Sequence, residues 1–291
     1  MASILCLPSA STQPQVKAES AQVQVILMAG QSNMAGAGNF DALDPKTKAR
    51  LRQLGDQITI VTKRQSIQAT NKQLFTESKY HLKKYGFERT FGPELAMLLT
   101  LTATHPEQRY LVIKTAYGGT SLHGAWNPNW SQDKAQAAEQ GAYKQSLKLF
   151  AEHIQQIQQT LAYLTQQGTN YRLLGLGWLQ GENDTNSALK AMHYKQNLQN
   201  LVAAYRTQLA QPELKVVVAQ INMQAKKYPE GTNLVRTAQQ QAADADPFIR
   251  LLPTSLDPSW IDYPKHFDNV HYNTKGQINM GKTFASAFLS F

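Results

Sequence analysis

The sequence contains a single cysteine, Cys6, among its 291 residues. One cysteine cannot form an intramolecular disulfide, and it excludes a structural zinc site that is built from several thiolates. Only 17% of the residues are charged, and no stretch approaches the roughly 20 apolar residues that cross a membrane. We therefore expect a globular fold without a membrane partner, for which the 42% of hydrophobic residues provide an ample core.

Long runs of basic residues are also absent, although the formal net charge is +9, from 29 Lys and Arg against 20 Asp and Glu. The densest basic positions are the pairs Lys63-Arg64 and Lys83-Lys84. Surfaces that follow nucleic-acid phosphates carry denser clusters, so we expect no nucleic-acid partner. We interpret the charge as a general property of the surface, with steering of an anionic substrate as the alternative.

The first 22 residues differ in composition from the rest. Residues 4–10 are similar to the end of a secretory signal, but no basic residue precedes them and the apolar part is short. We interpret 1–22 as a leader or flexible tether, which favours a secreted or periplasmic location over a cytoplasmic one. Residues 23–291 contain no internal repeat and no low-complexity linker, so we predict one domain there. The sequence leaves the oligomeric state open.

Apolar segments with strand character alternate with segments of helical periodicity. We expect strands at 23–29, 57–61, 110–116, 173–179, 216–221 and 248–252. We expect helices from about 93 to 101 and over 133–167, 189–209, 233–243 and 275–289. This alternation predicts an α/β fold, with a parallel sheet that has helices on both faces. Residues 62–90, 120–132 and 253–270 are expected to be loops over one end of the sheet.

Two polar clusters directly follow predicted strands. Residues 30–34 (GQSNM) place Ser32 where a strand turns into the next element, at the edge of a parallel sheet where ligands bind. A capping serine is the structural alternative. Residues 116–121 contain Gly118 and Gly119, which permit close approach of the backbone to a ligand. Free amides there are suited to bind an oxyanion, and a simple turn is the alternative.

Two further clusters carry titratable side chains. In residues 178–184 (WLQGEND), Gln180 is suited to donate a hydrogen bond, and we expect Glu182 to tether a loop rather than to act as a base. Near the end of the chain, Asp268 and His271 are three residues apart, so the carboxylate and the imidazole can reach one site together. The alternative residues for this pair are His266, Asp257 and Asp262.

Five segments occur in one order along the chain: GQSNM (30–34), FGPELA (91–96), KTAYGGTSL (114–122), WLQGEND (178–184) and DNVHYNTKG (268–276). Together they resemble the SGNH-hydrolase superfamily, and they are most similar to its sialate O-acetylesterase-like branch, which includes carbohydrate esterase family 6. The matches span residues 25–285. The resemblance implies the SGNH hydrolase fold, a three-layer α/β/α sandwich with a flavodoxin-like central parallel sheet.

The resemblance also implies roles for individual residues. Ser32 corresponds to the nucleophile, His271 to the general base and Asp268 to the acid that orients it. The oxyanion hole would comprise the amides of Ser32 and Gly119, with Gly118 as the neighbouring alternative, and the side chain of Gln180. No metal and no organic cofactor are implied.

Other residues near these segments are candidates for supporting or substrate-binding roles. Gln31 and Asn33 flank the serine, and Gly118 and Glu182 belong to the clusters above. Trp126 follows the glycine turn, where its ring either stacks on a sugar or packs inward as a loop anchor.

We therefore expect a serine esterase that removes O-acetyl groups from carbohydrates, such as acetylxylan or related glycans, through an acetyl-enzyme intermediate. An acetylated carbohydrate is the expected partner. One alternative is a general small-acyl esterase without sugar preference, and another is a carbohydrate-binding relative without turnover.

Overall fold

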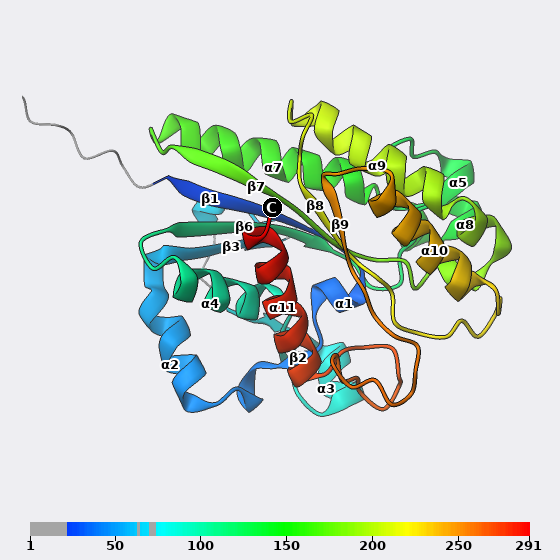
Figure 1. Cartoon of the computed structure of the whole chain (residues 1–291), viewed down its shortest axis with the longest axis horizontal. Helices are drawn as coiled ribbons and strands as arrows, with labels where there is room; N and C mark the ends of the chain where they lie inside the picture. The colour runs from blue at the N-terminus through cyan, green and yellow to red at the C-terminus, as the bar shows by residue number, and fades with distance from the viewer. Residues whose placement is uncertain (1–21, 63–64, 70–73) are drawn as a thin grey trace, which may run out of the picture.

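The computed structural model of the chain describes residues 22–62, 65–69 and 74–291, and a six-stranded sheet lies at its centre (Figure 1). All neighbouring strands of this sheet pair in parallel. The strands are β1 (Val23–Gly30), β3 (Ile58–Thr62), β6 (Arg109–Ala116), β7 (Tyr171–Leu179), β8 (Val216–Ala219) and β9 (Ile249–Leu252). The expected parallel sheet is thus confirmed.

The winding of the sheet reverses at β1. The spatial order is β3-β6-β1-β7-β8-β9, so β3 and β6 lie on one side of β1 and the later strands on the other. In flavodoxin the first strand lies between the second and third, whereas here the third strand, β6, lies between the second and the first. A parallel sheet binds its ligand at the carboxyl end of the strand where the winding reverses. The carboxyl end of β1 is therefore the expected place for a site.

Helices cover both faces of the sheet and complete the three layers. In Figure 1, α7, α9 and α10 lie on one face, and α2, α4 and α11 on the other. The helices are α1 (Ser32–Ala35), α2 (Pro45–Leu54), α3 (Lys79–Tyr85), α4 (Glu94–Thr104), α5 (Gln132–Ala138), α6 (Ala142–Gln145), α7 (Leu149–Gln166), α8 (Ala188–Met192), α9 (Tyr194–Gln208), α10 (Gly231–Asp244) and α11 (Thr274–Leu289). Short 3-10 turns lie at η1 (Phe40–Ala42), η2 (Gly55–Gln57), η3 (Ile67–Ala69) and η4 (Asp184–Asn186).

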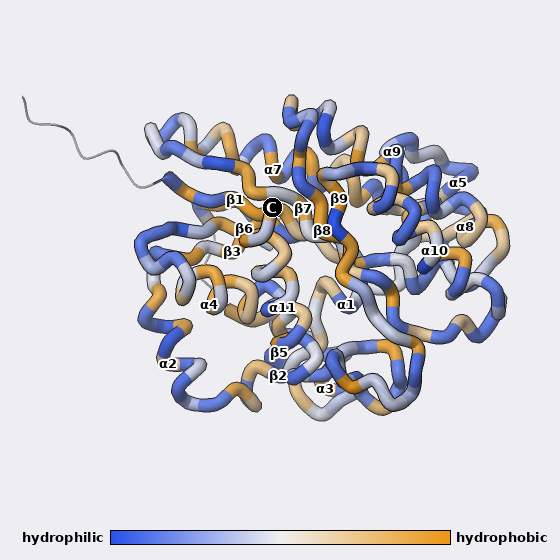
Figure 2. The backbone as a smooth tube through the Cα atoms, in the orientation of Figure 1, coloured by the Kyte–Doolittle hydropathy of each residue, from blue (hydrophilic) through white to orange (hydrophobic). Residues whose placement is uncertain are grey.

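The alternation of side chains along β1 divides the core into two parts. Every residue of β1 is buried, and Figure 2 shows the central strands as hydrophobic. Val25 and Leu27 pack in the core beneath α7, α9 and α10, whereas Ile26 and Met28 pack in the core beneath α2, α4 and α11. Since successive side chains of a strand point to opposite faces, one apolar strand supplies both cores.

Two predicted helices are divided in the structure. The segment 133–167 forms α5, α6 and α7 instead of one helix, because α5 ends at Glu139, whose side chain turns inward, and Gly141 adopts a φ of 80°. The segment 189–209 is divided into α8 and α9 at His193, which is the C-cap of one and the N-cap of the other. The apolar periodicity of the sequence continues across both breaks, so it did not predict where the helices end.

Residues 62–90, expected to be a loop, contain α3 and part of a second sheet. This antiparallel sheet has the order β2-β5-β4 and comprises β2 (Gly38–Asn39), β4 (Thr76–Glu77) and β5 (Arg89–Phe91). Ser78 caps the start of α3, and Gly86 ends it in the left-handed conformation. The helix α2 was not predicted either, although Asp44 caps it and Pro45 occupies its first turn.

Several expectations concern residues outside the described ranges. The leader or tether at 1–22, except for Gln22, lies there, as do Cys6, Lys63 and Arg64. The segments expected as loops, 120–132 and 253–270, carry no helix and no paired strand apart from Gln132, the first residue of α5, and one isolated bridge. In the described part of the chain, no helix has both the length and the apolar character that a membrane span requires.

The close packing of α11 on α4 predicts the effect of one substitution. A Cβ atom on Gly281 would lie 2.2 Å from the carbonyl oxygen of Pro93 and 2.8 Å from Cβ of Ala96. We expect Gly281→Ala to lower the free energy of unfolding by about 1–3 kcal/mol through overpacking, as measured by urea denaturation. Ser286→Ala, at an exposed position of the same helix, is the control. Equal stability of the two variants would contradict the close contact.

Candidate active site

Ser32 lies at the carboxyl end of β1, where the chain turns sharply into α1. A Cβ atom on Gly30 would lie 2.1 Å from the carbonyl oxygen of Leu179, so a larger residue does not fit at this turn. The N–H of Gln31 donates to the same oxygen at 3.1 Å. The turn therefore presents the Ser32 side chain at the point where the winding of the sheet reverses.

Asp268 and His271 lie in a hairpin over residues 264–273, between β9 and α11. An antiparallel bridge near its ends closes the hairpin. At its tip, Asn269 adopts a left-handed φ of 56°, which asparagine tolerates better than most residues. Figure 1 shows this hairpin beside α3, at the lower edge of the molecule. The hairpin brings a carboxylate and an imidazole from near the end of the chain to the start of α1, the helix that follows β1.

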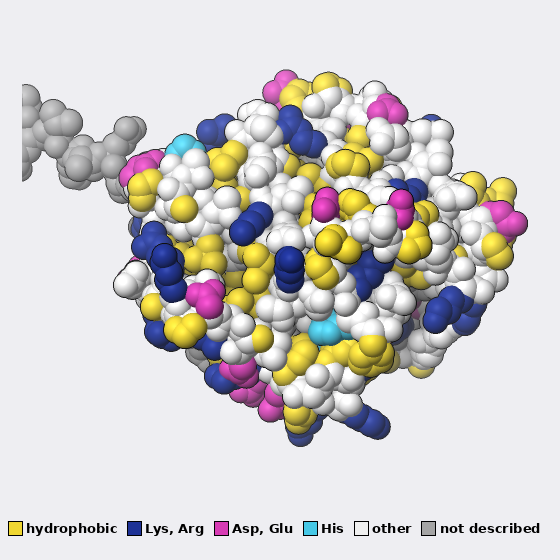
Figure 3. Space-filling view, turned by 60° about the horizontal axis from the view of Figure 1, so that its bottom comes forward, with side chains coloured by type: hydrophobic (Ala, Val, Ile, Leu, Met, Phe, Trp, Pro, Cys, Tyr) yellow, Lys and Arg dark blue, Asp and Glu magenta, His cyan; other side chains and the backbone are white. Residues whose placement is uncertain are grey.

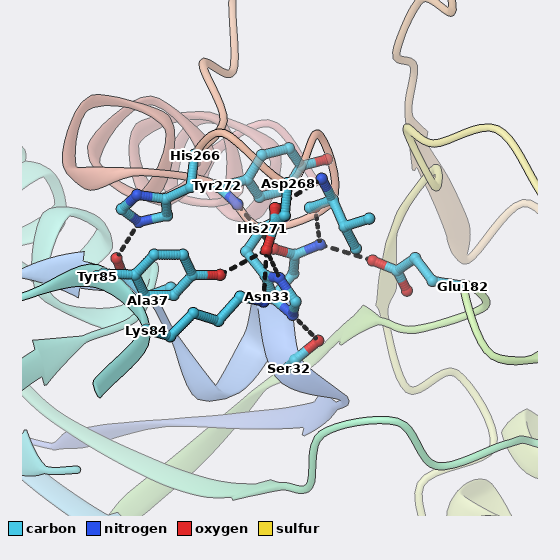
Figure 4. A network of polar contacts seen from close by, with 11 residues as sticks. Ser32, Asn33, Ala37, Lys84, Tyr85, Glu182, His266, Asp268, His271 and Tyr272 are labelled. Atoms are coloured by element: carbon cyan, nitrogen blue, oxygen red, sulfur yellow. Dashed lines mark hydrogen bonds and ion pairs between the residues drawn. The ribbon is translucent and has the colours of Figure 1, made fainter. Parts of the chain in front are cut away.

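The side chains of Ser32, His271 and Asp268 form a continuous hydrogen-bonded line (Figure 4). Nε2 of His271 lies 3.0 Å from Oγ of Ser32, and Nδ1 lies 2.8 Å from Oδ2 of Asp268. Oδ1 of Asp268 accepts the backbone N–H groups of Val270 and His271, each at 3.0 Å. In this geometry the imidazole can accept the serine proton, while the carboxylate orients the ring and stabilises the imidazolium.

Asn33, the residue after the serine, joins three segments through its buried side chain. Its Nδ2 donates to Oε1 of Glu182 at 2.7 Å and to the carbonyl oxygen of Val270 at 3.1 Å. Its Oδ1 accepts the N–H of Tyr272 at 3.0 Å. These bonds attach the hairpin to α1 on both sides of His271. Asn33 therefore fixes the distance between the imidazole and the Ser32 hydroxyl.

Glu182 makes the loop-tethering contact expected from the sequence. Its side chain is buried, and burial raises the pKa of its carboxyl, an effect that the hydrogen bond from Asn33 partly offsets. Oε2 of Glu182 has no hydrogen-bond partner among the described residues. Its one side-chain bond in that part of the chain is the contact with Asn33, so Glu182 holds α1 rather than the imidazole.

Gly118 lies against the serine, and Gly119 follows it in the turn after β6. A Cβ atom on Gly118 would be 3.4 Å from Cβ of Ser32, and Gly119 has a left-handed φ of 66°. The carbonyl oxygen of Gly119 accepts Nζ of Lys144 at 3.0 Å and Nδ2 of Asn183 at 2.9 Å. Within the described residues, the N–H groups of Ser32, Gly118 and Gly119 donate no hydrogen bond. They are therefore free to bind a negatively charged oxygen.

The side-chain amide of Gln180 is occupied by other groups. Its Nε2 donates to Oδ2 of Asp184 at 2.6 Å and to the carbonyl oxygen of Thr120 at 3.0 Å. A third contact, with Oε1 of Gln31, is 3.4 Å long. An amide has two hydrogens, so both are already used. To donate to an oxyanion, Gln180 would have to exchange one of these bonds, which makes it the least free of the three predicted donors.

Two buried carboxylates support the loop that follows Gly119. Asp184 accepts the N–H of Leu122 at 2.9 Å, and Glu139 accepts the N–H groups of Ser121 and Ala125 at 2.8 and 3.1 Å. Burial raises the pKa of Asp184 to about 6. Because buried N–H groups that lack a partner are costly, the two carboxylates fix the course of this loop. Neither residue was predicted from the sequence as part of the site.

The structure excludes the predicted sugar-binding role of Trp126. Its side chain is fully buried and lies edge-on against Trp178, with 5.2 Å between the ring centroids. A ring without an exposed face cannot stack on a sugar, so the burial of Trp126 favours the other role expected from the sequence, an inward-packed anchor of the loop. Whether an aromatic ring faces inward depends on its neighbours in space, which the sequence does not reveal.

The alternative residues for the acid and the base lie elsewhere. Nε2 of His266 contacts the carbonyl oxygen of Ala37 at 2.8 Å instead of the serine. Asp257 and Asp262 are exposed, and among the described residues neither contacts an imidazole. In the same residues, no group of three or more His, Cys, Asp or Glu side chains is arranged to hold a metal ion.

Lys84 and Tyr85 also reach the site, and neither was predicted from the sequence. Nζ of Lys84 lies 2.7 Å from Oδ2 of Asp268, and the hydroxyl of Tyr85 donates to the same oxygen at 2.6 Å. Burial opposes ionisation of Asp268, but donors from His271, Lys84 and Tyr85 outweigh it and hold its pKa well below the usual range. The available signal was the pair of capping residues, Ser78 and Gly86, that bounds α3.

The geometry can be compared with known proteins. The family model described as carbohydrate esterase, sialic acid-specific acetylesterase, matches residues 22–290. This chain belongs to that family. The expected relationship to sialate O-acetylesterases is thereby confirmed, and the protein is a carboxylic ester hydrolase of the carbohydrate esterase type. No curated protein matches the sequence.

Three solved structures illustrate the likeness of the fold. A protein from Arabidopsis thaliana is 19% identical, with a TM-score of 0.63, and the match covers 92% of this chain and 98% of that one. NanS is 15% identical, with a TM-score of 0.61 and coverage of 94% and 98%. XAC1771, a carbohydrate acetylesterase from Xanthomonas citri, is 16% identical, with a TM-score of 0.54 and coverage of 90% and 55%. At these identities the likeness concerns the fold.

The clamp made by Asn33 in this carbohydrate esterase predicts a loss of stability. Asn33→Ala leaves Oε1 of Glu182 and two backbone groups of the hairpin without their partner. We expect the free energy of unfolding to fall by about 2–4 kcal/mol, as measured by urea denaturation. Asn200→Ala, which removes a partly exposed amide from α9, is the control. Stability within about 0.5 kcal/mol of the wild type would show that the clamp contributes little.

The depressed pKa of Asp268 predicts how the stability of the esterase depends on pH. Its ionised form is favoured in the folded state, so its contribution is present above the unfolded value of about 3.9 and is lost as the pH falls below it. We therefore expect the stability difference between wild type and Asp268→Asn to be larger at pH 7 than at pH 3. Asp262→Asn removes an exposed carboxylate as a control. A difference that is the same at both pH values would contradict this prediction.

Proposed function

We propose that this esterase removes O-acetyl groups from carbohydrates, with Ser32 as nucleophile, His271 as general base and Asp268 as the residue that orients the imidazole. The observation that supports this proposal most strongly is the contact of 3.0 Å between Nε2 of His271 and Oγ of Ser32, with Asp268 at 2.8 Å on the other ring nitrogen. Membership of the carbohydrate esterase family supports the same class of reaction.

The first half-reaction forms an acetyl-enzyme. His271 accepts the hydroxyl proton while Oγ of Ser32 forms a bond to the acetyl carbonyl carbon, and the carbonyl oxygen becomes negatively charged. The free N–H groups of Ser32 and Gly119 stabilise this oxygen, where one such donor contributes about 3–4 kcal/mol to the transition state. The bond from the carbonyl carbon to the sugar oxygen then breaks. The imidazolium returns the proton to that oxygen, and the sugar leaves with a hydroxyl.

The second half-reaction releases acetate. His271 removes a proton from water, whose oxygen attacks the carbonyl carbon of the acetyl-enzyme. When the bond to Oγ breaks, the imidazolium protonates Ser32 and restores the starting state. The proposed role of Gln180 is mainly indirect, because its amide supports the Thr120 carbonyl and Asp184. Gly118 and Gln31 support the turn around the serine.

The acetyl group is the acyl group that the family description supports. Acetylated xylan, other acetylated glycans and O-acetylated sialic acids are all carbohydrate esters that one panel of substrates can compare. Acetate release is measured from each of them and from an aryl acetate that lacks a sugar. A higher kcat/KM with the sugar esters supports a carbohydrate esterase, whereas equal values on the aryl acetate support a general small-acyl esterase.

Variants of the proposed triad test the mechanism. We expect Ser32→Ala and His271→Ala each to lower kcat by at least about 10⁴-fold, because both remove the activated nucleophile. Asp268→Asn should retain more activity, since the serine and the imidazole remain. Acetate release is followed with the best substrate of the panel, and a folded state is verified by thermal denaturation. Unchanged turnover by Ser32→Ala would overturn the assignment of the nucleophile.

A further inference from the structure

The short helix α3 places two hydrogen-bond donors on the carboxylate that orients His271. Nζ of Lys84 and the hydroxyl of Tyr85 lie 2.7 and 2.6 Å from Oδ2 of Asp268. The imidazole of His271 contacts the same oxygen at 2.8 Å (Figure 4). One carboxylate oxygen therefore has three partners, and one of them is a permanent cation. The negative charge of Asp268 therefore interacts both with the imidazole of His271 and with the ammonium group of Lys84.

The position of α3 is determined from both of its ends and by one aromatic contact. Ser78 accepts the N–H of His81 at the first turn, and Gly86 closes the last turn. The ring of Tyr85 stacks on His266, with 4.0 Å between centroids, and His266 is itself bonded to the carbonyl oxygen of Ala37. The hairpin that carries Asp268 therefore also holds the hydroxyl of Tyr85 beside this carboxylate.

Most of α3 does not contribute to the apolar core. None of its residues is buried, and Tyr80 and Leu82 are 59% and 49% exposed. Figure 3 shows the corresponding side of the molecule, where hydrophobic side chains gather beside an exposed histidine. The helix α3 thus adds little to the core, but two of its adjacent residues contact the carboxylate of Asp268. Its main structural contribution is therefore made at the site.

We propose that Lys84 and Tyr85 are positioning residues of the esterase reaction, and that the positive charge of Lys84 beside Asp268 determines where the acid limb of the pH–activity profile lies. This inference rests on the proposed function. The carboxylate of Asp268 by itself stabilises the imidazolium that forms during the reaction. A cation on the same carboxylate oxygen opposes that effect, while both donors prevent the carboxylate from turning away.

Other titratable groups around the imidazole do not take the place of the Lys84 charge beside Asp268. His81, from α3, has its pKa lowered to about 4 by burial and by the neighbouring His271, His266 and Lys84, so it carries no charge at neutral pH. His266 uses Nε2 to contact a backbone carbonyl. Among the described residues, Lys84 is the one lysine or arginine in ion-pair contact with Asp268.

Two groups face the pair from the opposite side of the site. Glu182 is buried beneath Asn33, and burial raises the pKa of its carboxyl. Lys265 is partly buried and contacts the side chain of Asn222 at 3.2 Å, and burial lowers its pKa. Both remain in every variant considered below. A change in the pH profile on removal of Lys84 therefore reports the charge of Lys84 itself.

The test compares four variants of the full chain over pH 4 to 9. Lys84→Met removes the charge and keeps an apolar stem, Lys84→Arg restores the charge, and Tyr85→Phe removes only the hydroxyl. Lys83→Met removes the exposed neighbouring charge of the same helix and is the matched control. For each variant, kcat and KM on an acetyl ester are measured as a function of pH, and thermal denaturation verifies the folded state.

We expect Lys84→Met to move the acid limb of kcat/KM upward by about 1 pH unit, with KM changed less than twofold. Lys84→Arg and Lys83→Met should retain the wild-type limb. Tyr85→Phe should lower kcat several-fold and move the limb less, because it removes a neutral donor. An unchanged acid limb in Lys84→Met, with or without a lower melting temperature, would reduce Lys84 to a structural contact and overturn the proposal.

A second measurement separates this inference from the choice of substrate. A fluorophosphonate modifies an activated serine without any acetyl ester, so the pH dependence of Ser32 labelling reports the serine and imidazole directly. If labelling shifts in Lys84→Met while no acetyl ester is hydrolysed, the proposed function fails and the role of Lys84 stands. If acetyl esters are hydrolysed but neither profile shifts, the proposed function stands and the role of Lys84 fails.

Discussion

The hydrogen bonds of the Asn33 side chain are the constraint on which the site depends. They join α1 to the hairpin across 237 residues of sequence and to Glu182 across 149. The strands of the sheet bring Ser32 to one edge, but sheet packing alone does not determine where the hairpin lies. Because the bonds of Asn33 are buried, breaking one leaves a polar group without water or partner, and the arrangement is therefore narrowly defined.

Two buried carboxylates fix a loop on the other side of the serine. Glu139 and Asp184 each accept backbone N–H groups from residues 121–125, and Gln180 links Asp184 to the neighbouring turn. These carboxylates lie below the surface and do not line the reacting centre. The apolar sheet supplies strand ends at fixed positions, whereas desolvated polar groups determine the conformation of the loops that leave those ends. Rigidity of the site thus has a different origin from stability of the core.

The sheet was predictable because β1, β6 and β7 are apolar runs of strand length that end in glycine or in a polar cluster. The Ser32 and His271 positions followed from motifs that lie at such ends or close the chain. The contact between α3 and Asp268 was not predictable, since it joins residues 183 positions apart and α3 is only seven residues long, too short for a periodic pattern. The inward orientation of Trp126 was hidden for a related reason, because only its neighbours in space determine it.

The tip of the hairpin, residues 266–271, lies outside the sheet and has no buried side chain, whereas Tyr272 at its base packs in the core beneath α2, α4 and α11. Segments of this kind open locally at a lower free energy than the core in which β1 is buried. Mild denaturant can therefore separate His271 from Ser32 in molecules whose secondary structure is intact. For this protein, loss of turnover would measure local opening of the hairpin and would precede global unfolding.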